Sequence, residues 1–445
     1  MEISRSESPA TYPSERYAWY VVGVLMLAYT FSYIDRTILT LLVNPVRASL
    51  RISDVQISLL HGLAFAIFYT FLGIPLGWLA DRAKRTRIIG WGILIWSLMT
   101  ALCGMARNFW QMFVARIGVG IGEAALSPAA YSMMADYFRP ERVTLAISVY
   151  ATGVYVGSGL ALIVGGAMIA ATPALDVPVL GSFEPWQVVF LAVGVPGLAL
   201  AALMKTVKEP PRHGVIGAPG KVPAASLGET AKFVGARWRT YGAHFIGYSM
   251  LAALWNGSTA WIPTFFFRIH GWTPGEVGLG FGFAILIFGS AGISLGGVIS
   301  AWLRRRGRLD SDIRVGVIAV ACLIPVGIAA PLMPSAQAAL ALYGIMVFFA
   351  SLPYGAAAAA LMEVTPNQMR GLVSAAYLFV VNLAGIGLGP TFVAMITQYG
   401  FGDDLAVKYA LAVAVAVTAP VSLTFLILAM KPFRAAVVAA RAWQS

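Results

Sequence analysis

The stretch at residues 57–85, ISLLHGLAFAIFYTFLGIPLGWLADRAKR, decides the fold class. Its apolar part, residues 57–80, contains no Asp, Glu, Lys or Arg, and about 20 mostly apolar residues are enough for a helix to span a lipid bilayer. The run ends in a short segment, residues 81–85, that carries three basic side chains. Because loops rich in Lys and Arg stay in the cytoplasm, this pattern predicts a membrane-spanning helix followed by a cytoplasmic loop.

The composition of the whole chain points the same way. Of its 445 residues, 59% are hydrophobic and only 11% are charged, and the mean hydropathy is +0.78. Soluble domains carry about 25% charged residues, so this composition excludes a water-soluble enzyme. The two cysteines, Cys103 and Cys322, lie within apolar runs and exclude a secreted protein held together by disulfides. The chain is therefore predicted to be an integral membrane protein without enzymatic activity.

Twelve apolar stretches of similar length occur along the chain, and we predict that each is a membrane-spanning helix. Their approximate ranges are 18–44, 57–80, 88–106, 109–134, 143–171, 186–204, 241–267, 277–303, 313–333, 336–362, 371–398 and 405–430. The segments predicted to lie inside hold 24 Lys and Arg residues, whereas the outer loops hold five. This asymmetry predicts that both termini are cytoplasmic, and it accounts for the net charge of +12 without a nucleic-acid partner.

A polar segment between the sixth and seventh stretches divides the chain into two halves. The halves resemble each other, because a shift of 220 residues aligns Gly62 with Gly282 and Gly77 with Gly297. Such a six-plus-six repeat is typical of transporters that bind their substrate between the halves, near the middle of the membrane. We therefore expect a cytoplasmic N-tail, an N-terminal six-helix bundle, a cytoplasmic linker, a C-terminal six-helix bundle and a cytoplasmic C-tail, at residues 1–17, 18–204, 205–240, 241–430 and 431–445.

Four ionisable side chains lie deep within the predicted spans, where such groups are costly and usually functional. Asp35 and Arg36 are in the first span, and Arg116 and Glu123 are in the fourth. Arg116 and Glu123 are seven positions apart, so they share one helix face about 10 Å apart, and the helical rise places Asp35 at a depth between them. We expect an Asp35–Arg116 ion pair and an Arg36–Glu123 pair. A static buried salt bridge that only fixes helix packing is the alternative.

The predicted role of these groups is proton coupling combined with binding of an anionic headgroup. Burial in an apolar environment raises the pKa of a carboxyl group, whereas a neighbouring Arg lowers it. A motion that separates acid from base would therefore change the affinity for protons, and protonation would release an Arg for an anionic substrate group. We assign proton coupling to Asp35, Glu123 and Arg116. The headgroup site is assigned to Arg36, Arg116, Tyr150 and Asn382, with a hydrogen bond between helices as the alternative for the last two.

The second half has no equivalent charges. The same shift of 220 residues places Trp255 and Asn256 opposite Asp35 and Arg36, and we assign Trp255 and Asn256 to the opposite wall of the cavity. One wall is therefore charged and the other is neutral. This asymmetry favours an amphipathic substrate, with its headgroup on one side and its hydrocarbon tail on the other.

Four motifs resemble those of a known family. Residues 77–85, GWLADRAKR, resemble the loop signature G-x-L-x-D-R-x-x-R of the major facilitator superfamily. Residues 32–36, SYIDR, resemble the N-Y-x-D-R in the first span of spinster-like transporters. Residues 116–124, RIGVGIGEA, resemble their R-x-x-V-G-x-G-E-A, and residues 156–159 match their V-G-S-G. The superfamily resemblance covers the whole chain, and the spinster-like motifs lie in its first half.

This resemblance implies an all-α membrane protein with the major facilitator superfamily fold, twelve transmembrane helices in two six-helix halves that rock to give alternating access. It also implies proton-coupled movement of lysophospholipids or sphingoid phosphates. In the loop signature, Gly77 lets two helices approach closely, and Asp81 faces the start of the eleventh span. With the basic residues Arg82 and Arg85 it forms a latch that holds one conformation.

Two other functions remain open from the sequence. One is a proton-coupled symporter of small organic or aromatic anions on the same fold, and the other is a membrane receptor or scaffold that does not translocate. The sequence has no G-K-[ST] phosphate loop and no metal-ligand spacing, so we expect no cofactor, neither ATP nor a metal. The expected partners are an amphipathic lipid substrate, protons and membrane lipids, with a monomeric protein in a bacterial inner membrane.

Overall fold

The computed structural model describes residues 12–444 apart from 81, 174, 178–180 and 212–225. Ten of the described helical segments are long and apolar enough to cross a membrane. Two further segments lie among these ten: one is formed by α6 and α7, and the other is the 33-residue helix α12. Together they give six long segments in each half of the chain.

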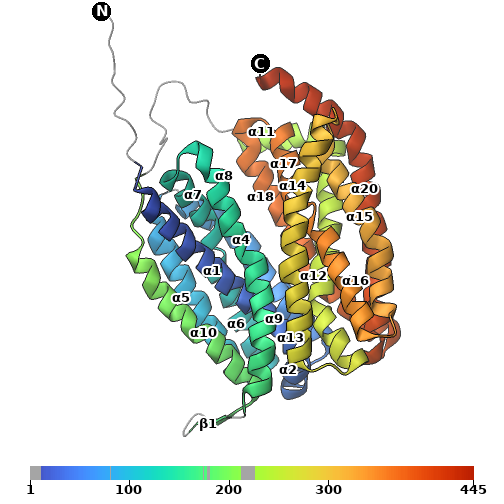
Figure 1. The fold of residues 1–445 in the computed structure, drawn as a ribbon. Helices are drawn as coiled ribbons and strands as arrows, with labels where there is room; N and C mark the ends of the chain where they lie inside the picture. The colour runs from blue at the N-terminus through green and yellow to red at the C-terminus, as the bar shows by residue number, and fades with distance from the viewer. Residues whose placement is uncertain (1–11, 81, 174, 178–180, 212–225, 445) are drawn as a thin grey trace, which may run out of the picture.

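The first six segments form one bundle, drawn from blue to green in Figure 1. Its elements are α1 (Glu15–Leu41), α2 (Val43–Leu50), α3 (Asp54–His61), α4 (Leu63–Ala80), α5 (Arg85–Cys103), α6 (Phe109–Glu123), α7 (Leu126–Tyr137), α8 (Pro140–Ala151), α9 (Gly153–Ala171), β1 (Leu175–Val177), β2 (Gly181–Phe183), α10 (Pro185–Leu203) and η1 (Met204–Thr206).

The second bundle is drawn from yellow to red, and it follows the short helix α11 (Leu227–Ala236). Its elements are α12 (Trp238–His270), α13 (Pro274–Ala284), η2 (Ile285–Gly289), α14 (Ser290–Arg305), α15 (Ser311–Ala329), η3 (Ala330–Leu332), α16 (Ala336–Ser351), α17 (Tyr354–Val364), η4 (Asn367–Met369), α18 (Arg370–Asn382), η5 (Leu383–Leu388), α19 (Gly389–Met395), η6 (Ile396–Phe401), η7 (Asp404–Ala406) and α20 (Val407–Gln444).

Several spans are interrupted rather than continuous. Helices α3 and α4 break at Gly62, and α6 and α7 break just after Glu123. In the second bundle the π-helical turns η2, η5 and η6 widen the eighth and eleventh spans. Broken helices and π-turns are typical of transporters, whose binding sites lie at such breaks.

Two features depart from the sequence prediction of an all-helical chain with a C-tail. Strands β1 and β2 form a short antiparallel hairpin between α9 and α10. Helix α20 continues to Gln444, well past the predicted end of the twelfth span. The reason is tertiary packing: Phe433 and Val437 are buried, and Arg434 Nε donates to Asp310 Oδ2 at 2.8 Å.

The two bundles touch at one end of the molecule and diverge toward the other (Figure 1). We call the touching end, which carries α2 and the β1–β2 hairpin, the hairpin end, and the opposite end, which carries α11, the linker end. Where the two bundles touch, their helices contact each other at glycines. An ideal Cβ on Gly278 of α13 would lie 2.3 Å from the carbonyl oxygen of Leu162 in α9, and one on Gly62 would lie 2.5 Å from that of Ile386. Only glycine allows backbones to pack this closely.

Candidate functional site

Helix α1 carries two oppositely charged residues in the middle of a largely apolar segment. Asp35 is 2% exposed, and its carboxylate contacts α5 and α6. Thr100 Oγ1 of α5 donates to Asp35 Oδ2, and Arg116 Nη1 of α6 lies 3.4 Å from Asp35 Oδ1. Arg116 is itself 1% exposed, and its Nε donates to the carbonyl oxygen of Leu60 at 3.2 Å. Asp35 is therefore a buried carboxylate with one charged and one neutral partner.

Glu123 is the second buried carboxylate, and it lies at the end of α6. Its Oε2 accepts hydrogen bonds from Arg36 Nε at 2.6 Å and from Ser32 Oγ at 2.5 Å. Its Oε1 is buried and has no hydrogen-bond partner among the described residues. Ser32 and Arg36 are four residues apart on α1, so one helix face supplies both partners. The unpaired Oε1 is the position at which a proton would add without displacing either of them.

The structure contains both ion pairs that the sequence predicts, Asp35–Arg116 and Arg36–Glu123. We call these four side chains the buried charge cluster. The ring of Phe65 contacts both bases, since its centroid lies 4.4 Å from the guanidinium carbon of Arg36 and 5.8 Å from that of Arg116. Two acids and two bases, packed around one aromatic ring, thus form a single unit. Their roles in coupling and binding stay predictions.

Arg36 is the more exposed of the two bases. Its side chain is 13% exposed, against 1% for Arg116. The rings of Tyr33 and Tyr69 lie 4.9 and 4.6 Å from its guanidinium carbon, so aromatic faces surround the charge. From the other half, Tyr354 approaches Tyr33 closely enough for an electrostatic interaction and is 55% exposed. Of the two arginines assigned to the headgroup, the geometry therefore favours Arg36.

The sequence prediction missed five residues around the cluster: Ser32, Tyr33, Phe65, Tyr69 and Thr100. Ser32 and Tyr33 could have been found, because they lie about one helical turn from Arg36. The other three carry no local signal. Apolar spans contain many aromatic and hydroxyl side chains, and only the packing of α4 and α5 against α1 and α6 selects these.

Tyr150, which was assigned to the headgroup site, lies inside the first bundle. It is fully buried and stacks on Tyr29, with the ring centroids 4.5 Å apart. Its hydroxyl is 3.2 Å from that of Ser127. In this conformation its polar atom therefore serves packing between helices and not the open space.

The residues assigned to the neutral wall, Trp255 and Asn256, come from α12, and Asn382, which was assigned to the headgroup site, comes from α18. Asn256 Nδ2 donates to the carbonyl oxygen of Ala252 in its own helix at 2.9 Å. Trp255 and Asn382 are half-buried, and Asn382 is the last residue before the wide turn η5. None of these residues brings a charge to the cluster.

The predicted latch lies at the linker end of α4 and α5, and Asp81 falls outside the described residues. An ideal Cβ on Gly77 would lie 3.8 Å from Pro128 Cβ, which is an ordinary van der Waals distance. In this conformation Gly77 makes no unusually close helix contact, and its role in the latch stays a prediction. Arg82 is exposed. The ends of the two bundles are apart here, so little can press against Gly77.

Arg85, the last residue of the predicted latch, is buried within its own half. Its Nη1 donates to Asp136 Oδ2 at 2.5 Å, and its Nε donates to Glu209 Oε1 at 2.7 Å. The backbone N–H of Thr86 donates to Glu209 Oε2 at 3.0 Å. Burial acts to raise the pKa of Glu209, but the hydrogen bonds from Thr86 and Arg85 outweigh it and hold the pKa below its usual value. Arg85 therefore ties the linker to α5 and α7, and a latch to the other half stays a prediction.

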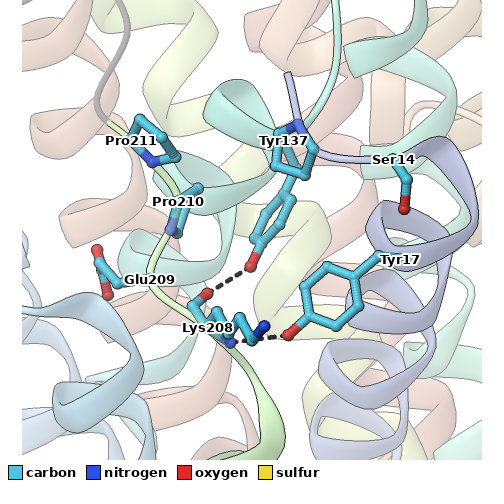
Figure 2. Close-up of a pocket in the computed structure, with 8 residues that line it drawn as sticks. Ser14, Tyr17, Tyr137, Lys208, Glu209, Pro210 and Pro211 are labelled. Atoms are coloured by element: carbon cyan, nitrogen blue, oxygen red, sulfur yellow. Dashed lines mark hydrogen bonds between the residues drawn. The ribbon is translucent and has the colours of Figure 1, made fainter. Parts of the chain in front are cut away.

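Two tyrosines fix the same linker segment from its other side, as Figure 2 shows. The backbone N–H of Lys208 donates to Tyr17 Oη at 2.9 Å, and Tyr137 Oη donates to the carbonyl oxygen of Lys208. These residues line a cavity of about 440 Å³ that also involves Ser14 and Pro211. The cavity contains no member of the buried charge cluster. We therefore assign it to anchoring of the linker.

Four charged residues join the two halves at the hairpin end, and we call Arg47, Asp54, Arg268 and Asp404 the clasp. Arg268 Nη1 and Nη2 donate to Asp54 Oδ2 and Oδ1 at 2.7 and 2.9 Å. Arg47 Nη1 donates to Asp404 Oδ2, and Arg47 Nε lies 3.5 Å from Asp54 Oδ1. Arg47 and Asp54 belong to the first half and the other two to the second. These cross-half contacts exist only while the hairpin end is closed.

Within the described part of the chain, no group of three or more His, Cys, Asp or Glu side chains is placed to hold a metal ion.

Comparison with known proteins gives three findings. A sequence model described as the Major Facilitator Superfamily matches residues 25–390. An MFS-type efflux pump of Mycolicibacterium smegmatis is 28% identical over 407 residues, which cover 88% of this chain and 87% of the pump. A hexuronate transporter of Bacillus subtilis is 25% identical over 394 residues, which cover 85% of this chain and 87% of that protein.

Among solved structures, the chain is similar to a bacterial homologue of the human lysosomal transporter spinster, crystallised in an inward-facing and unoccupied conformation. The TM-score is 0.78 and the sequence identity 28%, and the match covers 97% of this chain and 99% of that one. The likeness extends over both halves.

Proposed function

Because the chain belongs to the Major Facilitator Superfamily, we propose that it is a transporter that couples movement of an amphipathic lipid to protons. It would work by alternating access, in which the two halves rock about a substrate site between them. The lipid would be of the lysophospholipid or sphingoid-phosphate type. The single observation that carries this proposal is the buried charge cluster, whose most exposed member is Arg36.

The conformation supports an opening toward the cytoplasm. The clasp closes the hairpin end, while the bundles diverge at the linker end (Figure 1). The distribution of Lys and Arg assigns the linker end to the cytoplasm. On that assignment both termini are cytoplasmic, and the similarity to bacterial relatives supports a bacterial membrane. The similarity to an inward-facing spinster homologue supports the same assignment.

Proton coupling is supported by the way the two carboxylates are held. Each is paired with one Arg and one hydroxyl, and each lies almost entirely out of solvent. A buried carboxylate that loses its cationic partner cannot stay ionised at low cost, so it takes up a proton. A motion that pulls Arg36 toward a substrate headgroup would remove that partner from Glu123. Substrate binding and protonation are thereby linked.

The lipid class is supported by the contrast between the two walls. Arg36, framed by Tyr33 and Tyr69, offers a cation and aromatic faces to an anionic or zwitterionic headgroup. Opposite it, Trp255, Asn256 and Tyr354 bring no charge. A hydrocarbon tail can lie along such a wall, whereas a small dianion would leave one end without a partner.

A proton-coupled symporter of small organic anions is the second candidate. The observation that favours it is the similarity to the Bacillus subtilis hexuronate transporter, which extends over most of both chains. A sugar acid carries one carboxylate, which Arg36 alone could bind. The two candidates differ in the length of apolar surface that the substrate must cover.

The coupling proposal is tested by flux into proteoliposomes under an imposed pH gradient. We expect Asp35→Asn and Glu123→Gln to abolish proton-driven flux while leaving folding and ligand binding largely intact. The exposed carboxylate Glu229 supplies a matched control, since Glu229→Gln removes a charge outside the cluster. Normal proton-driven flux in both cluster variants would refute the coupling role.

The substrate class is tested by mass spectrometry of lipids that co-purify with the protein. We expect a lysolipid or sphingoid phosphate with the wild type and its loss with Arg36→Ala. The second candidate is tested by asking whether hexuronate inhibits lipid transport in the same proteoliposomes. Transport of hexuronate without any co-purifying lipid would favour the second candidate instead.

A further inference from the structure

A small cavity lies beside Asp35, and Arg116 is not among the residues that line it. Its volume is about 10 Å³, and its lining comes from α1, α5 and α10. A cavity of about 10–15 Å³ holds one water molecule if it offers two to four polar partners. The lining residues are Phe31, Asp35, Trp96, Ser97, Thr100, Val193, Gly194 and Gly197.

Ser97 is the residue that makes this cavity polar. The residue is 1% exposed, and its Oγ is buried without a hydrogen-bond partner among the described residues. Burying a hydroxyl without a partner is costly. The hydroxyl is directed at α10, because an ideal Cβ on Gly197 would lie only 2.1 Å from Ser97 Oγ. Glycine at this position therefore leaves room for the hydroxyl and for the cavity beside it.

Asp35 and Thr100 supply the remaining polar atoms. Asp35 Oδ1 is occupied by Arg116 and Oδ2 by Thr100, and a carboxylate can accept about four hydrogen bonds in all. Thr100 Oγ1 uses its only proton on Asp35, so its lone pairs are left to accept. Ser97 Oγ can both donate and accept. The cavity thus offers one acceptor-only group and two hydroxyls.

We propose that this cavity is a binding site for a single water molecule, held by Ser97, Thr100 and Asp35, with Ser97 as a positioning residue for Asp35. The water donates one hydrogen to the Asp35 carboxylate and is held by the two hydroxyls. When Asp35 is protonated, the water turns and accepts from its O–H. Because Ser97 can reverse its own hydrogen bond, both protonation states of Asp35 are accommodated without backbone movement.

The role in proton exchange rests on the proposed function, whereas the water site itself does not. The charged and titratable groups that face Asp35 are Arg116 of α6, Arg36 of its own helix, Glu123, and the Cys103 thiol of α5. Helix α10 carries no ionisable residue. The water and the Thr100 hydroxyl are therefore the polar neighbours that stay with Asp35 when Arg116 moves.

The experiment compares Ser97→Ala with Ser258→Ala in thermal unfolding of the full-length protein. Ser258 is a matched control, because it is also 1% exposed with an unpartnered Oγ in the described structure, yet it lines neither the water cavity nor the linker cavity. Removing an unpartnered hydroxyl leaves stability unchanged or raises it. We expect that result for Ser258→Ala. For Ser97→Ala we expect an unfolding temperature lower by about 2 °C, since a bound water loses one of its partners.

A second readout is the pH dependence of proton-driven flux, which a purely structural role of Ser97 would not move. Loss of the water removes a donor to the ionised carboxylate, so the pH midpoint of flux should rise by about one unit. The proposal is overturned if Ser97→Ala is as stable as the wild type or if the midpoint does not move. If Asp35→Asn keeps proton-driven flux, the proposed function fails, and the stability comparison alone then decides the water site.

Discussion

Replacing Asp54 by Asn should shift the whole transporter toward an outward-open conformation. The Asp54 side chain is 2% exposed and the Arg268 side chain is 7% exposed. The Asp54 carboxylate accepts hydrogen bonds from Arg268 Nη1 and Nη2 at 2.7 and 2.9 Å. Removing one partner of a buried ion pair costs about 3–5 kcal/mol. Arg268 keeps a weaker contact with Asp404 at 3.9 Å, so we take the lower value of about 3 kcal/mol.

This cost falls on one conformation only, because Asp54 and Arg268 belong to different halves. When the hairpin end opens, both side chains enter water, and the variant loses nothing there. At about 1.4 kcal/mol per tenfold change, the conformational equilibrium should move by about 100-fold. Asp54 also begins α3 and favours its dipole, but that contribution is present in both conformations and cancels.

The assay measures the distance between two spin labels by double electron–electron resonance. The labels are attached at Met105 and Tyr399, two exposed positions at the hairpin end on opposite halves. The parent protein has Cys103 and Cys322 replaced, so that only the introduced cysteines react. We expect a long-distance population in Asp54→Asn that is minor in the parent. Arg268→Gln should give a similar population, and the double variant should not exceed either single one. An unchanged distance distribution in Asp54→Asn, or additive effects in the double variant, would show that the clasp does not hold this conformation.

Three further outcomes are expected. Gly278→Ala should also open the hairpin end, since its Cβ would lie 2.3 Å from the carbonyl oxygen of Leu162. A Cβ at Gly297 would meet no atom within 4 Å, so Gly297→Ala should be neutral or stabilise α14 by about 1 kcal/mol in thermal unfolding. Tyr69→Leu should raise the KM for transport about two- to fivefold through loss of an aromatic face near Arg36, and Tyr69→Phe should restore it; equal KM values for the two would exclude the contact. The pKa of Glu209 is lower in the folded protein than in the unfolded chain, so its carboxylate stabilises the fold fully above the usual pKa of about 4.3. That stabilisation is lost as the pH falls through the pKa of the folded state. Glu209→Gln should therefore lose less unfolding temperature in acid than the wild type does.

The spans and the pairing of charges could be predicted because the membrane imposes simple rules. Apolar runs of about 20 residues have few alternatives in a bilayer, and four charges in apolar surroundings must find one another. The helical rise placed Asp35 at a depth between Arg116 and Glu123, and the pairing of opposite charges was the expectation added to it. Both pairs are present at 3.4 and 2.6 Å.

The remaining features depend on contacts between distant segments. The clasp joins Asp54 to Arg268, 214 positions away, and no local pattern selects that partner. The extension of α20 is similar, because Arg434 resembled part of a solvated basic tail until its contact with Asp310 is seen. The predicted role of Gly77 is not visible in this structure for another reason. Its suggested role concerns a closed linker end, and the conformation described has that end open.

The buried charge cluster also has an electrical consequence. With Asp35 and Glu123 ionised, their two negative charges cancel those of Arg36 and Arg116. An empty, unprotonated carrier therefore reorients without carrying net charge through the field in its core, and membrane voltage does no work on that step. One added proton leaves a single positive charge, for which each 100 mV is worth about 2.3 kcal/mol across the full field. On the proposed coupling, voltage should then act on steps in which the cluster holds the added proton without an anionic substrate, because an anionic headgroup would cancel that charge. The return of the empty carrier stays untouched.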